Sequence, residues 1–200
     1  MIKIGLTGPT GAGKSTVAEW LLCAGVPVID SDKVAREITL PGQPTLSVLA
    51  EAFGKDILLP DGSLDRKKLA ERAFSDPDST ARLNAITHPA ITERVKTAFA
   101  TYEAAGEKAV VLDAPLLFES TLDRVCDHTV AVLAPESVRL ARIRARDSLS
   151  EDAAKTRMNA QPGDDFYTAR AEIILHNDGD PDALKRQTEE LLSRIAGWTV

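Results

Sequence analysis

The sequence is poor in residues that build covalent or metal-held scaffolds. Its 200 residues include only two cysteines, Cys23 and Cys126, and three histidines that stand far apart. This spacing argues against a disulfide framework and against a zinc site. Because both cysteines lie in apolar surroundings, we expect two reduced, buried thiols.

Aromatic side chains and positive charge are also scarce. The chain has five Phe, two Trp and two Tyr, and its formal net charge is −6 with no long basic block. Nucleic-acid-binding surfaces need clustered Lys and Arg, often with aromatic platforms, so no nucleic-acid partner is predicted. No apolar run approaches membrane-spanning length, and the start lacks the pattern of a secretory signal. These absences favour a cytoplasmic enzyme with no membrane partner.

What the sequence does contain is a phosphate-binding pattern near its start. Residues 8–15 fit G-x-x-x-x-G-K-[ST] and are followed by Thr16, with an alternating apolar run before them and apolar residues at helical spacing after them. The glycines let successive backbone N–H groups face an anion. Lys14 would meet the β- and γ-phosphates, and the Ser15 hydroxyl could ligate Mg²⁺. The predicted phosphate contacts are Gly8, Gly11, Ala12, Gly13, Lys14, Ser15 and Thr16.

The apolar pattern predicts an α/β fold. Short strands are expected at residues 2–6, 26–30, 108–113, 128–133 and 173–175, and the continuous apolar runs suit parallel strands buried on both faces. A mostly helical block separates the second strand from the third, and within it Pro89 is expected to open a long helix to about residue 105. Two rather polar helices follow the fourth strand, and a pair with so few apolar anchors could move as a lid. We therefore predict one domain with three parts: a nucleotide-binding core (1–32, 106–135 and 172–200), a helical substrate-binding subdomain (33–105) and a lid (136–171).

Acidic residues stand at the ends of two predicted strands, where an open α/β sheet binds its ligands. Asp32 could accept the proton of an attacking hydroxyl or support Mg²⁺ through water. One of Asp30, Ser31 and Asp32 could instead cap the next helix, although capping does not use both acids. Asp113 could help to position Mg²⁺, or it could serve as a strand-end cap or ion-pair partner.

Three arginines fall on one face of the helix predicted after the fourth strand. Arg139, Arg142 and Arg146 are spaced at i, i+3 and i+7. They could form a row of guanidinium groups facing phosphates, or a solvated basic face. Spacing alone leaves both alternatives open.

The ordered set of motifs resembles the dephospho-CoA kinase family over essentially the whole chain. The loop at 8–16 is similar to the family's G-x-x-G-x-G-K-S-T form, and residues 28–32 look like its I-D-A-D segment. Other matching segments follow in the family's order: Val34-Ala35-Arg36, Pro41-Gly42, Phe53-Gly54, Gly62-Ser63-Leu64-Asp65-Arg66, Leu83-Asn84-Ala85-Ile86-Thr87-His88-Pro89, Asp113-Ala114-Pro115-Leu116-Leu117-Phe118-Glu119, Arg142, Arg146-Asp147, Arg157 with Gln161, and Ile174-Leu175-His176-Asn177-Asp178-Gly179. The loop alone is typical of a superfamily, whereas this series is far more specific.

The resemblance implies transfer of the ATP γ-phosphoryl group to the ribose 3′-hydroxyl of dephospho-CoA, with Mg²⁺. It also implies a P-loop NTPase-like α/β/α fold with a five-stranded parallel sheet, a helical CoA-binding subdomain and a lid. Asp32 matches the acid expected to activate the hydroxyl, and Arg142, with Arg146 as a further candidate, matches an arginine near ATP. Arg66 and His88 match positions of the CoA-binding block, although His88 could simply pack beside Pro89.

The chain departs from the family pattern at several positions, which weakens the assignment of roles in residues 162–176. Ser31 replaces a usual Ala, Tyr167 stands where a basic residue is frequent, Glu172 replaces Asp, and His176 replaces an acid. Two other functions are compatible with a phosphate-binding loop. One is a different P-loop small-molecule or nucleoside monophosphate kinase, and the other is a nucleotide-switched binding protein, which would need N-K-x-D and D-x-x-G segments that the chain lacks.

Overall fold

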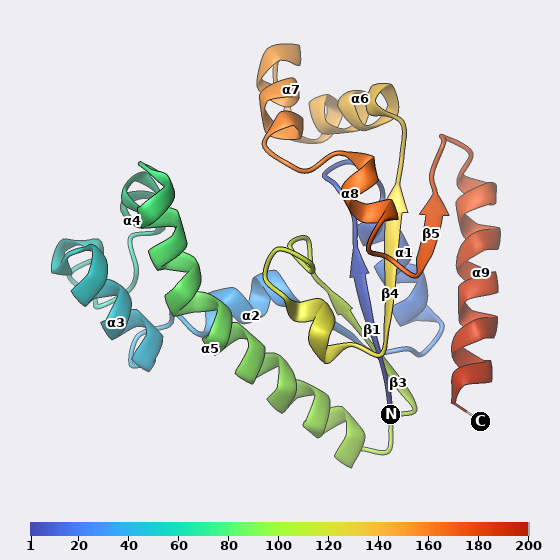
Figure 1. Ribbon diagram of the computed structural model, residues 1–200, viewed down its shortest axis with the longest axis horizontal. Helices are drawn as coiled ribbons and strands as arrows, with labels where there is room; N and C mark the ends of the chain where they lie inside the picture. Colours follow the sequence, from blue (N-terminus) through green and yellow to red (C-terminus); the bar gives the residue numbers. More distant parts are fainter. Residues whose placement is uncertain (200) are drawn as a thin grey trace. The chain divides into compact units, whose positions relative to one another are not determined.

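The computed structural model describes residues 1–199 (Figure 1). The chain divides into two compact units, which are described one after the other. The sheet unit comprises Met1–Ile29 together with the chain from Thr101 onward. The helical unit comprises Asp30–Ala100.

A five-stranded parallel sheet organises the sheet unit, as predicted. Its strands are β1 (Ile2–Thr7), β2 (Val28–Asp30), β3 (Ala109–Asp113), β4 (His128–Leu133) and β5 (Ile173–His176), in the order β2-β3-β1-β4-β5. The central strand β1 pairs in parallel with both β3 and β4, and β4 pairs with β5. The carboxyl ends of β1, β3 and β4 therefore meet at one edge of the sheet.

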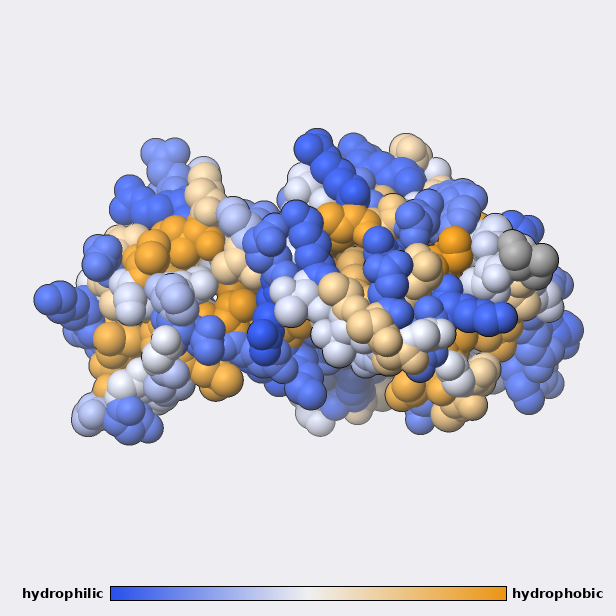
Figure 2. Space-filling view, turned by 90° about the horizontal axis from the view of Figure 1, so that it is seen from below, coloured by the Kyte–Doolittle hydropathy of each residue, from blue (hydrophilic) through white to orange (hydrophobic). Residues whose placement is uncertain are grey.

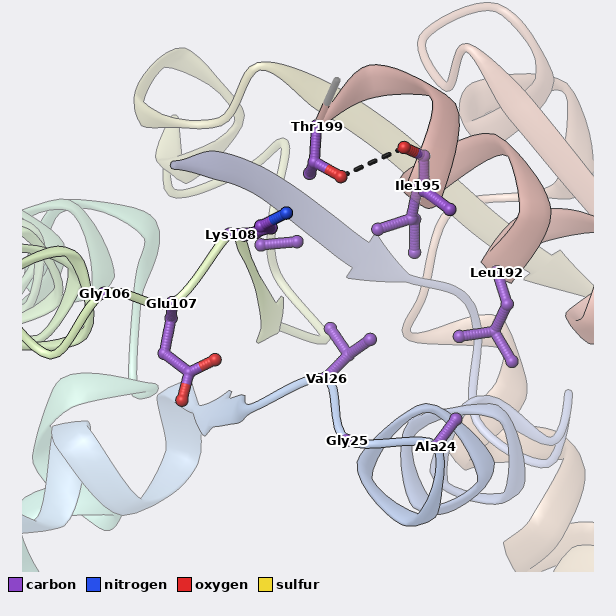
Figure 3. Close-up of a pocket in the computed structure, with 11 residues that line it drawn as sticks. Ala24, Gly25, Val26, Gly106, Glu107, Lys108, Leu192, Ile195 and Thr199 are labelled. Carbon is purple, nitrogen blue, oxygen red and sulfur yellow. Dashed lines mark hydrogen bonds between the residues drawn. The ribbon is translucent and has the colours of Figure 1, made fainter.

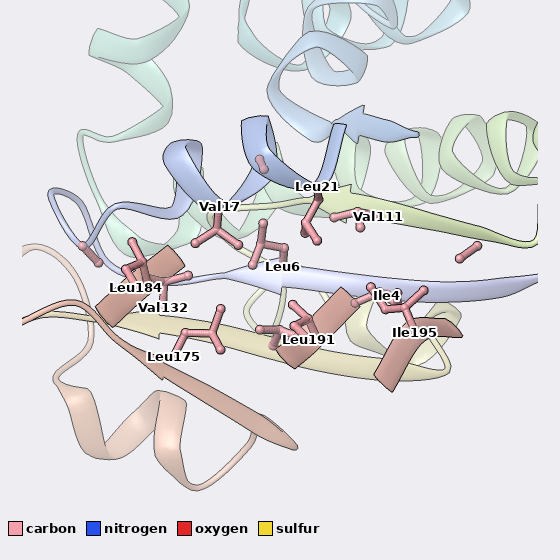
Figure 4. Close-up of a cluster of buried hydrophobic side chains, with 14 of the residues drawn as sticks. Ile4, Leu6, Val17, Leu21, Val111, Val132, Leu175, Leu184, Leu191 and Ile195 are labelled. Atoms are coloured by element: carbon pink, nitrogen blue, oxygen red, sulfur yellow. The ribbon is translucent and has the colours of Figure 1, made fainter. Parts of the chain in front are cut away.

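Side-chain alternation along the strands gives the sheet two apolar faces. Ile4 and Leu6 point to the face covered by α1 (Lys14–Cys23) and α9 (Pro181–Trp198), where they join Val17 and Leu191 in the main core (Figure 4). On the other face, residues of β4 pack with Tyr167 of α8 (Asp164–Thr168). Helices on both faces complete the expected three-layer α/β/α arrangement.

Two further helices of the sheet unit, α6 (Glu136–Asp147) and α7 (Glu151–Asn159), pack against each other through a small apolar cluster of Ile143, Ala154 and Met158. A 3₁₀ turn at Leu122–Val125 precedes β4. The short helix α8 was not predicted, because five residues are too few to show a helical period.

The helical unit is built from α2 (Ser31–Glu37), α3 (Pro44–Phe53), α4 (Arg66–Ala73) and most of α5 (Pro77–Ala104), with a 3₁₀ turn at Lys55–Ile57. Its core contains Leu49, Phe53, Ile57 and Leu69. These apolar residues come from separate helices, so the unit has a core of its own.

The prediction that Pro89 begins a helix is wrong, because Pro89 lies inside α5. The helix begins at Pro77, where the Asp76 carboxylate accepts a 2.8 Å hydrogen bond from the Ser79 backbone N–H. An interior proline costs about 3 kcal/mol through the lost backbone hydrogen bond. Ile86 packs in the helical core before Pro89, and Val95 is fully buried after it, so packing on both sides offsets that cost.

The face of the molecule drawn in Figure 2 carries both kinds of side chain. In the view of Figure 2, hydrophilic and hydrophobic side chains alternate over short distances. No helix among residues 1–199 is long and apolar enough to cross a membrane. Both thiols are free, but the prediction that both are buried is wrong: Cys23 is exposed at the end of α1, and Cys126 is partly buried.

Candidate active site

The loop between β1 and α1 has the backbone shape that its glycines predict. Gly8, Gly11 and Gly13 have φ values of 144°, 78° and 103°, in the region that only glycine adopts readily. At Gly8 a side chain is also excluded by space, since a Cβ atom would lie 2.3 Å from the Val132 carbonyl oxygen. The Ala12 N–H donates to the Pro9 carbonyl at 3.1 Å and tightens the turn. The loop is thus a preformed anion cradle at the start of a helix.

Lys14, the first residue of α1, forms an ion pair with Asp113 at the end of β3. Only 14% of the Lys14 side chain and 17% of the Asp113 side chain is exposed. The pair holds the ammonium group beside the loop, in a partly desolvated position where its charge acts strongly on a phosphate. The ion pair is one of the alternatives that the sequence left open for Asp113.

The residues around the loop suit a magnesium ion only in company with a phosphorylated ligand. The Ser15 hydroxyl is exposed in the first turn of α1, and the Asp113 carboxylate lies next to Lys14. Both are the oxygen donors that Mg²⁺ prefers. However, no cluster of three or more His, Cys, Asp or Glu residues able to hold a metal occurs within the described chain. The donor set fits an ion that takes its remaining ligands from phosphate and water.

The Arg142 side chain of α6 contacts backbone carbonyl groups of the phosphate loop. Its Nη1 donates to the Gly11 and Ala12 carbonyl oxygens at 3.3 and 3.5 Å, and its Nη2 donates to Asn177 Oδ1 at 2.9 Å. Asn177 in turn donates from Nδ2 to the Ala12 oxygen at 2.7 Å. The resemblance implied an arginine near ATP at this position, and that role stays a prediction. For Asn177 the sequence predicted no role beyond its place in a matching motif, because a polar residue that follows a strand does not indicate which groups it will bind.

The other two arginines of the predicted face, Arg139 and Arg146, do not share this environment, so neither alternative for the three-arginine face is right. Arg139 is buried, and its Nε and Nη1 groups have no hydrogen-bond partner within residues 1–199. Its nearest acid is Asp164 of α8, 3.8 Å away. Arg146 is exposed and pairs with its neighbour Asp147 at 2.8 Å. Helical spacing puts the three side chains on one face, but the environment along that face changes from buried to exposed.

Tyr167 lies near Arg139 and is also buried without a partner. Its hydroxyl has no hydrogen bond in the described part of the chain, and burial raises the pKa of the phenol to about 12. The nearby charges of Glu119 and Asp164 raise this pKa, whereas that of Arg139 lowers it. Tyr167 replaces a residue that is often basic in the resembled family, and here it packs as part of the second apolar face.

Gln161, just after α7, is a loop contact that sequence reasoning did not single out for a role. Its Oε1 accepts a 2.8 Å hydrogen bond from the Thr10 backbone N–H. This bond joins the helices that follow β4 to the first half of the phosphate loop. The only signal in the sequence was the glutamine's place in the resemblance, four residues after Arg157.

The remaining predicted residues belong to the helical unit. Asp30 caps α2, since its carboxylate accepts from the Asp32 and Lys33 N–H groups at 2.8 and 3.1 Å. Capping therefore falls to Asp30, and the exposed carboxylate of Asp32 takes no part in it. Arg66 donates to Thr39 Oγ1 at 2.9 Å. His88 is half-buried inside α5, and burial lowers its pKa below the ordinary value of 6.5.

A cavity of about 500 Å³ lies elsewhere in the sheet unit (Figure 3). It is lined by the end of α1, the turn before β3 and the last turns of α9, among them Val26, Lys108 and Ile195. These segments stand at the amino ends of β2 and β3, whereas the phosphate loop follows the carboxyl end of β1. The cavity is therefore separate from the loop site.

Comparisons with known proteins agree on one family. The family model described as dephospho-CoA kinase matches residues 2–182. A dephospho-CoA kinase from Corynebacterium efficiens is 46% identical over 195 residues, covering 98% of each chain. Among solved structures, TT1252 from Thermus thermophilus has a TM-score of 0.82 at 33% identity, covering 96% of this chain and 97% of its own. The dephospho-CoA kinase from Campylobacter jejuni has a TM-score of 0.74 at 25% identity, covering 99% and 98%.

Proposed function

Because the chain belongs to the dephospho-CoA kinase family, we infer that it transfers the γ-phosphoryl group of ATP to the ribose 3′-hydroxyl of dephospho-CoA. The products are CoA and ADP. The observation that carries this inference in the structure is the glycine-shaped loop with the desolvated Lys14 at its end. This is the donor half of a two-substrate phosphotransferase.

On the donor side, the residues supply positioning and positive charge. Phosphoryl transfer needs the donor and acceptor oxygens in line and the charge on the transferred group neutralised. We propose that residues 11–16 bind the ATP phosphates, with Lys14 neutralising the β- and γ-phosphates. Arg142 is the better placed of the two candidate arginines, since it already contacts the loop, whereas Arg146 is paired with Asp147.

Mg²⁺ is part of the proposal, because kinases use it to bridge the β- and γ-phosphates and to neutralise their charge. The Ser15 hydroxyl would hold it, with support through water from Asp113 or Asp32. The proposed location is the cytoplasm, since the reaction consumes ATP.

On the acceptor side, we propose Asp32 as the general base for the 3′-hydroxyl. Its carboxylate is exposed and is not used for capping α2, so it is available to accept a proton. Arg66 and His88 are proposed to bind dephospho-CoA within a subdomain of residues 33–105. Residues 136–171 are proposed as the lid that excludes water during transfer, which a kinase needs to avoid hydrolysing ATP.

The test is a direct assay of acceptor choice. The protein is mixed with Mg-ATP and, in separate reactions, dephospho-CoA, AMP or shikimate, and ADP release and phosphorylated product are both measured. We expect product only with dephospho-CoA. Turnover with another acceptor and none above background with dephospho-CoA would overturn the proposal.

A further inference from the structure

The buried amide of Asn177 is a polar group whose two hydrogen bonds both serve the phosphate loop. Asn177 follows β5 and is 5% exposed, and its backbone N–H donates to the Leu133 oxygen at 2.8 Å, which fixes it to β4. Its side chain then bridges two groups, the Ala12 carbonyl at 2.7 Å and the Arg142 guanidinium at 2.9 Å.

The partners of Asn177 dictate which way its amide points. A carbonyl oxygen can only accept a hydrogen bond and a guanidinium can only donate, so Nδ2 must face Ala12 and Oδ1 must face Arg142. A carboxylate of the same shape would satisfy Arg142 but would place an acceptor against the Ala12 oxygen. The site therefore requires an amide specifically.

The bond to Ala12 determines the direction of the neighbouring N–H group. In a trans peptide the C=O of Ala12 and the N–H of Gly13 point in opposite directions. Holding the carbonyl toward Asn177 turns the Gly13 N–H away from it, and no carbonyl in residues 1–199 accepts a bond from this N–H. Gly13 cannot carry a side chain here, because a Cβ atom would lie 2.2 Å from Asn177 Nδ2.

We propose that Asn177 is a positioning residue for the phosphoryl donor. It fixes the Ala12–Gly13 peptide so that the Gly13 N–H faces the β-phosphate, and it holds Arg142 against the loop. Donors aligned before the ligand arrives need no reorganisation on binding, which is why their loss lowers both affinity and rate. The inference rests on the proposed function only in taking an ATP-type polyphosphate as the loop's ligand.

The test compares Asn177→Asp with Gln187→Glu. Gln187 is a matched control: its amide also donates to a backbone carbonyl, that of His176 at 2.8 Å, but it does not contact the loop. Affinities for ADP and AMP are measured by calorimetry. We expect N177D to weaken ADP binding about tenfold, since the hydrogen bond to the Ala12 carbonyl is exchanged for a repulsion and the Gly13 N–H is no longer held in place. AMP, which has no β-phosphate, should change less than about twofold.

Each result decides the inference. ADP affinity within about twofold of the unmodified protein in N177D overturns it, as does an equal loss in Q187E or an equal loss for AMP. If N177D does not fold, N177A is measured by the same criteria, because alanine removes the donor without adding a repulsion. ADP binding needs no acceptor, so failure here is distinct from failure to phosphorylate dephospho-CoA.

Discussion

Replacing the buried Arg139 by methionine should stabilise the sheet unit. Within residues 1–199 the Nε and Nη1 groups of Arg139 have no hydrogen bonds, and the Asp164 carboxylate is 3.8 Å away with 47% of its side chain exposed. Each unsatisfied buried polar group costs about 1–3 kcal/mol, and a half-exposed ion pair returns about 0–1 kcal/mol. Methionine keeps the apolar stem that packs there. We expect R139M to raise the free energy of unfolding by about 1–3 kcal/mol, or Tm by about 2–10 °C.

The assay should follow the sheet unit alone, because two units need not unfold as one. Trp20 and Trp198 are the chain's two tryptophans, and both pack against the main core of the sheet unit. Their fluorescence during urea unfolding therefore reports on the unit that contains Arg139.

Arg142→Met is the matched control, one turn along the same helix. It removes the donor from the buried Asn177 oxygen, so it should lower stability by about 1–3 kcal/mol. A loss of more than about 1 kcal/mol in R139M as well would refute the reasoning, since it would mean that the Arg139 guanidinium is satisfied and stabilising.

Three other outcomes can be measured. Asp32→Asn should keep ATP affinity while the phosphorylation rate falls at least about 100-fold, as expected for a general base, and near-normal turnover would remove Asp32 from that role. Burial lowers the pKa of His88, so stability should be full above about pH 6.5 and decline below it as the unfolded chain takes up the proton first. Circular dichroism melts of His88→Gln should lack that decline. The exposed Cys23 should react quickly with a thiol reagent at pH 8, whereas Cys126, whose pKa burial and the charges of Asp123 and Asp127 raise to about 12, should stay unmodified; equal rates would contradict this.

The parts of the fold that were predictable are those whose cause is local. Alternating apolar residues, the glycines of the loop and the apolar spacing after Lys14 act within a few residues, and the strand, loop and helix follow from them. The position of Pro89 was misjudged because the packing of Ile86 and Val95 on either side of it depends on tertiary contacts.

Of the candidate site, only the residues of the phosphate-loop motif could be predicted from the sequence. Lys14 and Ser15 could be identified from spacing, but the partners that hold the loop come from far along the chain. Gln161 contacts Thr10, and Asn177 contacts Ala12. No periodicity links such positions. Arg139, Arg142 and Arg146 show the same limit, since the first is buried, the second contacts the loop and the third is exposed to solvent.

The place of β1 at the centre of the sheet has a consequence for biosynthesis. Strand β1 is synthesised before both of its partners, so one of its edges stays unpaired until Ala109–Asp113 is made and the other until His128–Leu133 is made. The phosphate loop that follows β1 lacks one of its hydrogen bonds for longer still, until Asn177 is made and can bind the Ala12 carbonyl. The nascent chain therefore carries an unpaired apolar strand while all the residues between Thr7 and Ala109 are added, a state that favours aggregation. Nucleotide binding is accordingly expected among the last properties that the new chain acquires, and a chain truncated before residue 177 should lack it.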